Sequence, residues 1–307
     1  MIKYFIYFFI IIFFSFCEKF PKLTLGTGDE LGNYHRGGLI LREFASKSGL
    51  EIDVINTDGS YENVMSVGHG KLNLGLSQKD VLVYFNYLSE DHKKASQNSL
   101  VIAPIELEYL HIIVNNNSKI KSMDDLQKKK IATGSVKSGT SFTFGFLNYY
   151  LYKTGIDKPN FLVMDEKEAI NKVAKGELDA AFLVSTLGTK LLTDLPEDSN
   201  IRLLSYSKGE IPERIKEVYL LGTIPAKTYS WQKEEITVPV VHSFLIASPF
   251  APEKSIRKLV KIIYENEDKL DANSEIWSEN ATEVYYQLRD SGIPYHPIVQ
   301  EYFRKKK

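Results

Sequence analysis

The sequence predicts an α/β protein with two similar lobes. Beyond residue 21, short apolar strands alternate with glycine-rich turns and segments of helical period, the pattern of parallel sheets layered with helices. This pattern occurs twice at a constant spacing. At 307 residues the chain is long enough for two ordinary domains, each with its own core. We therefore expect two lobes with a ligand cleft between them, at the carboxyl ends of the strands.

The internal repeat has an offset of 106 residues, as in 133 − 27 = 106. Helices are predicted over 34–48 and 60–67 in the first unit, and over 141–153 and 166–173 in the second. The paired landmarks are Thr27 and Thr133 in the first turn, Gly49 and Gly155 after the first helix, Gly70 and Gly176 after the second, and Leu74 and Ala180 at the third strand. Two unrelated βαβαβ units with equal loop lengths are the alternative, but internal similarity explains four equal spacings more simply.

The C-terminal part is expected to return to the first lobe. A strand is predicted over 240–247, and helices over 252–264 and 275–288. The chain then crosses between the lobes twice, which makes a two-strand hinge. The expected division is residues 22–107 with 243–307 in lobe 1, and residues 108–242 in lobe 2.

Residues 1–21 read as a leader. A positive start at Lys3 precedes an apolar run over 4–16, which fits a secretory signal and is short for a membrane-spanning helix. Cys17, the single cysteine, ends that run, so it predicts a lipidated N-terminus that tethers the chain to a membrane. An uncleaved anchor or ordinary signal cleavage nearby stays open. The location expected from this leader is extracytoplasmic, in the periplasm or on a membrane surface.

Composition and motifs argue against several function classes. With 38 basic and 39 acidic residues there is no basic field to attract nucleic acid, and the run 304–307 is expected to be a solvated tail. The six histidines lack metal-ligand spacing, and no GxSxG nucleophile motif occurs. Gly26 and Gly28 are followed by Gly32, one position too late for a dinucleotide-binding GxGxxG. No cofactor, metal or catalysis is expected.

The second-unit turn, ATGSVKSGTSF over 132–142, has the form of an anion-binding loop. It is not a P-loop, since Thr140 stands where that motif needs lysine after its second glycine. A helix start offers unpaired backbone N–H groups and the positive end of the helix dipole, so it receives a carboxylate without a lysine. Ser138 and Ser141 flank this helix start, and Lys137 is the cation best placed to neutralise an anionic ligand.

Matching turns supply the other candidate contacts. Ser60 has the position of an N-cap with Asn63 three residues on, and capping and ligand contact are both open for this pair. Gln78 and Ser185 follow the third strands of the two units, where side chains point toward a cleft. The turn before the first helix contributes Thr27, Gly28, Asn33 and Tyr34.

These motifs, in their order along nearly the whole chain, resemble the TAXI family of solute receptors of TRAP transporters. The matching segments are Gly26–Gly28, Gly32–Tyr34, Gly37–Gly38, Asp58–Asn63, Leu76–Val81, Glu108–His111, Ser122–Leu126, Gly134, Ser138–Thr140, Gly176–Ala180, Ile224–Tyr229 and Thr237–Val240. The resemblance implies a type II periplasmic-binding-protein fold without catalysis, a small acidic solute such as glutamate or a dicarboxylate, and TRAP transporter membrane subunits as partners. The pocket residues it implies by motif are Thr27, Gly28, Tyr34, Ser60, Asn63, Gln78, Ser138 and Thr140.

Two other readings stay open. An extracytoplasmic sensor or surface protein could use the same fold to close on a ligand without delivering it to a transporter. A secreted hydrolase ranks below both, because Lys153–Gly155 matches one β-lactamase element but no SDN element accompanies it.

Overall fold

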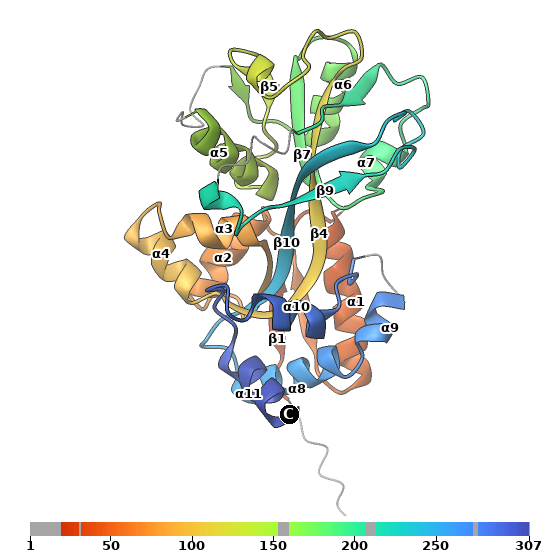
Figure 1. Cartoon of the computed structure of the whole chain (residues 1–307). Helices are drawn as coiled ribbons and strands as arrows, with labels where there is room; N and C mark the ends of the chain where they lie inside the picture. Colours follow the sequence, from red (N-terminus) through yellow and green to blue (C-terminus); the bar gives the residue numbers. More distant parts are fainter. Residues whose placement is uncertain (1–19, 31, 153–159, 207–212, 273–275, 307) are drawn as a thin grey trace, which may run out of the picture.

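A computed structural model of the chain describes residues 20–30, 32–152, 160–206, 213–272 and 276–306. Two lobes lie one above the other, joined by two long strands that run through both (Figure 1). The predicted leader, including Cys17, lies almost wholly within residues 1–19 and so outside the described residues. Within the described part, none of the helices has both the length and the apolar character needed to cross a membrane.

The first βαβαβ unit has its first strand in the middle. Its elements are β1 (Leu23–Gly26), α1 (Asn33–Lys47), β2 (Ile52–Ile55), α2 (Ser60–Gly68) and β3 (Leu74–Gln78), followed by α3 (Lys79–Phe85) and α4 (Glu90–Gln97). Strand β1 pairs in parallel with β2 on one side and with β3 on the other. All three strands therefore deliver their carboxyl ends to the same edge of the sheet.

The second unit repeats this order. Its elements are η1 (Asp124–Leu126), β5 (Ile131–Ala132), α5 (Gly139–Tyr152), β6 (Phe161–Leu162), α6 (Glu166–Ala174), β7 (Ala180–Ser185), α7 (Lys190–Thr193), β8 (Ile201–Leu203), η2 (Glu213–Ile215) and β9 (Leu220–Ile224). Strand β5 pairs in parallel with β6 and β7, as β1 does with β2 and β3. Helix α6 starts 166 − 60 = 106 residues after α2, and both span nine residues. The predicted repeat is confirmed at its other landmarks, whereas Gly155 lies outside the described residues.

Two long antiparallel strands join the units. Strand β4 (Leu100–Asn115) and strand β10 (Ile236–Ala247) lie side by side at the centre of the sheet, in the order β2-β1-β3-β10-β4-β7-β5-β6. The C-terminal part of β10 pairs with β3, and the C-terminal part of β4 pairs with β7. The predicted two-strand hinge is thus a continuous ladder shared by both lobes (Figure 1).

The C-terminal segment packs against the first lobe. It forms α8 (Glu253–Tyr264), α9 (Glu267–Ala272), α10 (Ala281–Leu288) and α11 (Pro297–Lys306). The predicted helix over 275–288 was too long, because residues 276–280 are not helical and α10 begins only at Ala281. The buried apolar residues of α8 and α11 belong to the same core cluster as those of β1 and β3, whereas two further clusters draw on residues 110–241. Arg304, Lys305 and Lys306 are exposed, as the expectation of a solvated tail requires, but they form the last turn of α11, whose Phe303 is buried.

Close packing between α2 and α4 gives a stability prediction. A Cβ atom on Gly68 would lie 2.2 Å from the backbone oxygen of Ala95, so one helix has to move to admit it. We expect Gly68→Ala to lower the free energy of unfolding by about 1–3 kcal/mol, the usual cost of overpacking. Lys94→Ala, at an exposed position of α4, is the control and should change the free energy of unfolding by less than about 0.5 kcal/mol. Urea unfolding of both variants measures this, and equal midpoints would contradict the packing account.

Candidate functional site

The turns at the helix starts of both lobes meet where the lobes face each other. Gly59 precedes α2 with φ of 104°, and a Cβ built on it lies 4.0 Å from the Cα of Ser138 at the start of α5. A Cβ on Gly139 would lie 1.8 Å from Oε1 of Gln78, so only glycine permits this approach. Starts of α2 and α5 therefore oppose each other across the lobes, with Gln78 between them.

Further contacts hold the lobes together. Asn33, the first residue of α1, donates from Nδ2 to Oγ1 of Thr186 at 2.6 Å, which joins lobe 1 to the loop after β7. At the start of α3, buried Asp80 accepts hydrogen bonds from the hydroxyls of Thr143 and Tyr219, the latter at 2.7 Å. Asn33 and Asp80 lie in the first lobe and their partners in the second, so these bonds tie the two lobes to each other.

The hinge strand β4 supplies a pair of buried carboxyls at this junction. Glu106 and Glu108 alternate along β4 and so share one face, with exposed fractions of 1 % and 6 %. The hydroxyl of Tyr34 donates to Oε1 of Glu108 at 2.6 Å, and Nε2 of Gln78 donates to Oε2 at 3.0 Å. Two predicted site residues, Tyr34 and Gln78, therefore converge on a carboxyl that had no predicted role.

The environment of this pair favours its protonated forms. Burial raises the pKa of Glu108 to about 7, against hydrogen bonds from Tyr34 and Gln78 that oppose the rise, and the charge of Asp80 adds to it. Burial, and then the charge of Glu108, raise the pKa of Glu106 well above its usual value. Oε2 of Glu106 and Oε1 of Gln78 are buried without a hydrogen-bond partner in the described structure.

Several predicted residues are engaged inside their own lobes. Asn63 donates from Nδ2 to the backbone oxygens of Thr27 and Leu76 and accepts from Thr57, so its amide braces the turn before α1. Thr27 is fully buried and donates to the oxygen of Ile55. Thr140 likewise accepts from the backbone N–H of Val184 in the second lobe. Each of these side chains therefore supports the backbone near a turn of the candidate site through hydrogen bonds within its own lobe.

The capping reading of Ser60 was wrong. Gly59 is the N-cap of α2 and no side chain caps that helix, because α2 already begins at Ser60. The buried Ser60 hydroxyl instead accepts the backbone N–H of Gln78 at 3.4 Å and hydrogen-bonds Tyr34. Ser138, directly before α5, does act as a cap, since its hydroxyl accepts the N–H of Ser141.

The remaining predicted residues lie at the rim. Lys137 is exposed, with Nζ 4.0 Å from Oδ2 of Asp58 and 5.9 Å from the ring centre of Tyr61, so it reaches from the second lobe onto the first. Ser141 and Ser185 are half-buried, at the start of α5 and the end of β7. A Cβ atom built on Gly28 would lie 3.8 Å from Cβ of Tyr34 and 3.9 Å from Cα of Gly59, which is ordinary van der Waals contact. Their ligand roles stay predictions.

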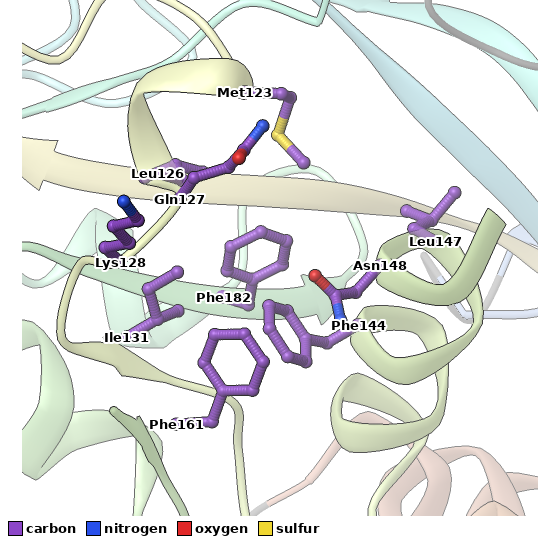
Figure 2. A pocket seen from close by; sticks show the side chains of 10 residues that line it. All are labelled: Met123, Leu126, Gln127, Lys128, Ile131, Phe144, Leu147, Asn148, Phe161 and Phe182. Carbon is purple, nitrogen blue, oxygen red and sulfur yellow. The ribbon is translucent and has the colours of Figure 1, made fainter. Parts of the chain in front are cut away.

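A separate cavity lies inside the second lobe. It has a volume of about 250 Å³ and lies between α5 and the strands β5, β6 and β7. Figure 2 shows the rings of Phe144, Phe161 and Phe182 gathered at its centre, with ring centres of Phe144 and each of the others 4.8 Å apart. Every lining residue belongs to 123–182, so this cavity is remote in sequence from the turns of the first lobe.

Metal chemistry finds no support in the described residues, where no three or more His, Cys, Asp or Glu side chains are grouped to hold an ion. His111 illustrates the core use of histidine in this chain. It is fully buried and hydrogen-bonds Tyr229 at 2.7 Å, and burial lowers its pKa to about 4. It therefore stays neutral at physiological pH.

The raised pKa of Glu108 predicts a pH dependence. Since the folded value of about 7 exceeds the unfolded value of 4.5, the contribution of this group to stability is full below pH 4.5 and is lost as pH rises through 7. Thermal unfolding is measured between pH 4.5 and 8. Over this range the free energy of unfolding of the wild type should fall by up to about 3 kcal/mol relative to that of Glu108→Gln. Glu43→Gln, at the exposed end of α1, should keep the wild-type slope. Parallel curves for wild type and Glu108→Gln would contradict this.

Comparisons with known proteins agree on one fold. A solved periplasmic transporter is 11 % identical with TM-score 0.55, covering 95 % of this chain and 99 % of its own. A histidine kinase sensor domain with similarity to periplasmic binding proteins is 13 % identical with TM-score 0.51, covering 83 % of this chain and 95 % of its own.

A Candida albicans protein with the generic periplasmic binding protein fold is 11 % identical with TM-score 0.50, covering 93 % of this chain and 81 % of its own. At such low identity these likenesses establish the fold alone, and it is the expected two-lobed type II periplasmic-binding-protein fold. The sequence also matches the profile of the NMT1-like family over residues 25–306. The chain belongs to the NMT1-like family.

Proposed function

We propose that the protein is an extracytoplasmic receptor that closes its lobes on a small acidic organic solute, either a glutamate-like amino acid or a dicarboxylate, and delivers it to a TRAP-type membrane transporter. The observation that carries this proposal is the opposition of the α2 and α5 helix starts across the lobes, with the start of α1 bonded to the loop after β7. Catalysis has no part in the proposal.

Helix starts suit an acidic solute for an electrostatic reason. Each presents backbone N–H groups that lack partners within the helix, together with the positive end of the helix dipole. A carboxylate can accept from such groups without a basic side chain, as at other helix N-termini that bind anions. We assign direct contact to Gly28, Tyr34, Gln78, Ser138 and Ser141, with Lys137 and Ser185 at the rim.

The hinge supports capture by closure. Strands β4 and β10 form the continuous connection between the lobes, and the bonds from Asn33 to Thr186 and from Thr143 and Tyr219 to Asp80 cross the interface. Opening the site means bending the ladder, breaking these polar contacts and separating the ring of Phe142 on α5 from Tyr61 and Phe85 of the first lobe. The lobe boundaries at 107/108 and 242/243 fall on these two strands, which favours the proposed division.

Membrane attachment belongs to the same proposal. The described fold starts at Phe20, directly after the apolar segment and Cys17, so lipidation of Cys17 would tether the receptor beside its transporter. A sensor role is the second candidate, because a histidine kinase sensor domain has the same fold. Solute uptake by membrane vesicles that depends on added receptor separates the two, since a sensor does not stimulate uptake.

Solute binding should stabilise the fold. In the chain from Phe20 onward, which contains every described element, a solute at 100 times its Kd should contribute about 2.7 kcal/mol and raise the Tm by about 5 °C. Ser141→Asp adds a carboxylate in the first turn of α5, which suits the helix but repels an anion, so affinity should fall at least about tenfold. Ser141→Asn is the neutral control of equal size.

A thermal-shift panel of amino acids and dicarboxylates, run on the wild type and both variants, measures this. Equal affinities for the Asp and Asn variants would show that the bound group is not an anion at the start of α5. An unchanged Tm across the whole panel would overturn the acidic-solute assignment.

A further inference from the structure

The carboxyl pair on β4 is unusual for a site that is proposed to hold an acidic solute. Glu106 and Glu108 lie on one face of the hinge strand, nearly fully buried, beside the helix starts. The charges that act on the pair are those of Asp80 on α3 and Arg36 on α1, and Arg36 is exposed and contributes only a small opposing effect on Glu106. Among the described residues, no cationic side chain forms an ion pair with either carboxyl.

Two side-chain oxygens at this place, one on Glu106 and one on Gln78, lack a hydrogen-bond partner in the described structure. Oε2 of Glu106 and Oε1 of Gln78 are buried side-chain oxygens with no hydrogen-bond donor in the described structure, and both residues are only 1 % exposed. Oε1 of Gln78 points at Gly139 across the lobe interface, and its other amide atom is bonded to Glu108. Buried acceptors are normally paired, so these oxygens need a donor that the fold does not supply.

We propose that Glu106, Glu108 and Gln78 form a subsite for a protonated amino group of the solute. The inference rests on the proposed receptor function and decides between its two solute classes: the ligand is an amino acid with a further acidic group, and a plain dicarboxylate is a poor ligand. The helix starts take the carboxylates, and the β4 pair takes the ammonium.

An ammonium group matches the hydrogen-bonding needs of these atoms. It has three N–H donors and no acceptor, and the site offers two unpaired acceptors together with the carboxyl of Glu108. Its positive charge would offset two carboxyls that are close and buried. A metal ion fits less well, because the described residues hold no group of three or more His, Cys, Asp or Glu arranged for one.

Matched solutes test the proposal. Binding of L-glutamate and glutarate, which differ only in the amino group, is measured by calorimetry on the chain from Phe20 onward, with L-aspartate and succinate as a second pair. We expect each amino acid to bind at least about a hundredfold tighter than its partner, because the partner leaves buried acceptors unpaired. Putrescine, an amine without a carboxylate, is the third probe.

Variants of Glu106 and Glu108 test whether these two carboxyls cause the preference for the amino acid. Glu108→Gln and Glu106→Gln should each weaken L-glutamate binding at least about tenfold and leave glutarate within about threefold of its wild-type affinity. Glu43→Gln removes an exposed carboxylate at the far end of α1 and is the control, with no expected change. Should either β4 variant not fold, the comparison of glutamate with glutarate on the wild type still decides.

The outcomes separate the two claims. If glutarate or succinate binds as tightly as its amino partner, the amino subsite is overturned and the acidic-solute receptor stands. If putrescine binds and loses affinity in Glu108→Gln while no acidic solute binds, the subsite stands and the acidic solute class falls. Absence of binding by all five probes overturns both.

Discussion

The β4–β10 ladder is the constraint on which the rest of the structure depends. Each strand lies in both lobes, so two separate parallel sheets become one, and the lobes face each other at the carboxyl ends of their strands. Those ends lead into the helix starts of α1, α2 and α5, and Asn33 bonds the first of them to the opposite lobe. One pair of strands thus sets both the hinge axis and the place where the helix starts of the two lobes meet.

Much of the fold was predictable because a repeated pattern of turns and helices can be recognised in the sequence. The glycines at 70 and 176 both have positive φ, of 72° and 75°, and so mark equivalent helix ends in both units. Strand periods and turn residues fixed the order of elements. The end of the chain was less predictable: Arg304 to Lys306 are charged, and only burial of Phe303 against the first lobe explains why that segment is helical.

The candidate site was predictable in its backbone and less so in its side chains. Turns imply where N–H groups lie, but Thr27, Asn63 and Thr140 turn inward to satisfy buried backbone groups, which no local pattern reveals. Glu106 and Glu108 did leave a signal: two acidic residues alternate within the apolar strand LVIAPIELEYLHIIV. Burying charged side chains in a strand costs free energy unless they are paired with an opposite charge or hydrogen-bonded.

That cost links the pair to the mechanism of closure. In the proposed open state water would solvate the carboxyls, whereas in the described structure their exposed fractions are 1 % and 6 %. Closure without a compensating cation therefore favours protonation of the pair, which agrees with the rise in the pKa of Glu108 to about 7. A solute that brings its own positive charge would offset this cost, so the proposed amino subsite links recognition of the solute to closure of the lobes.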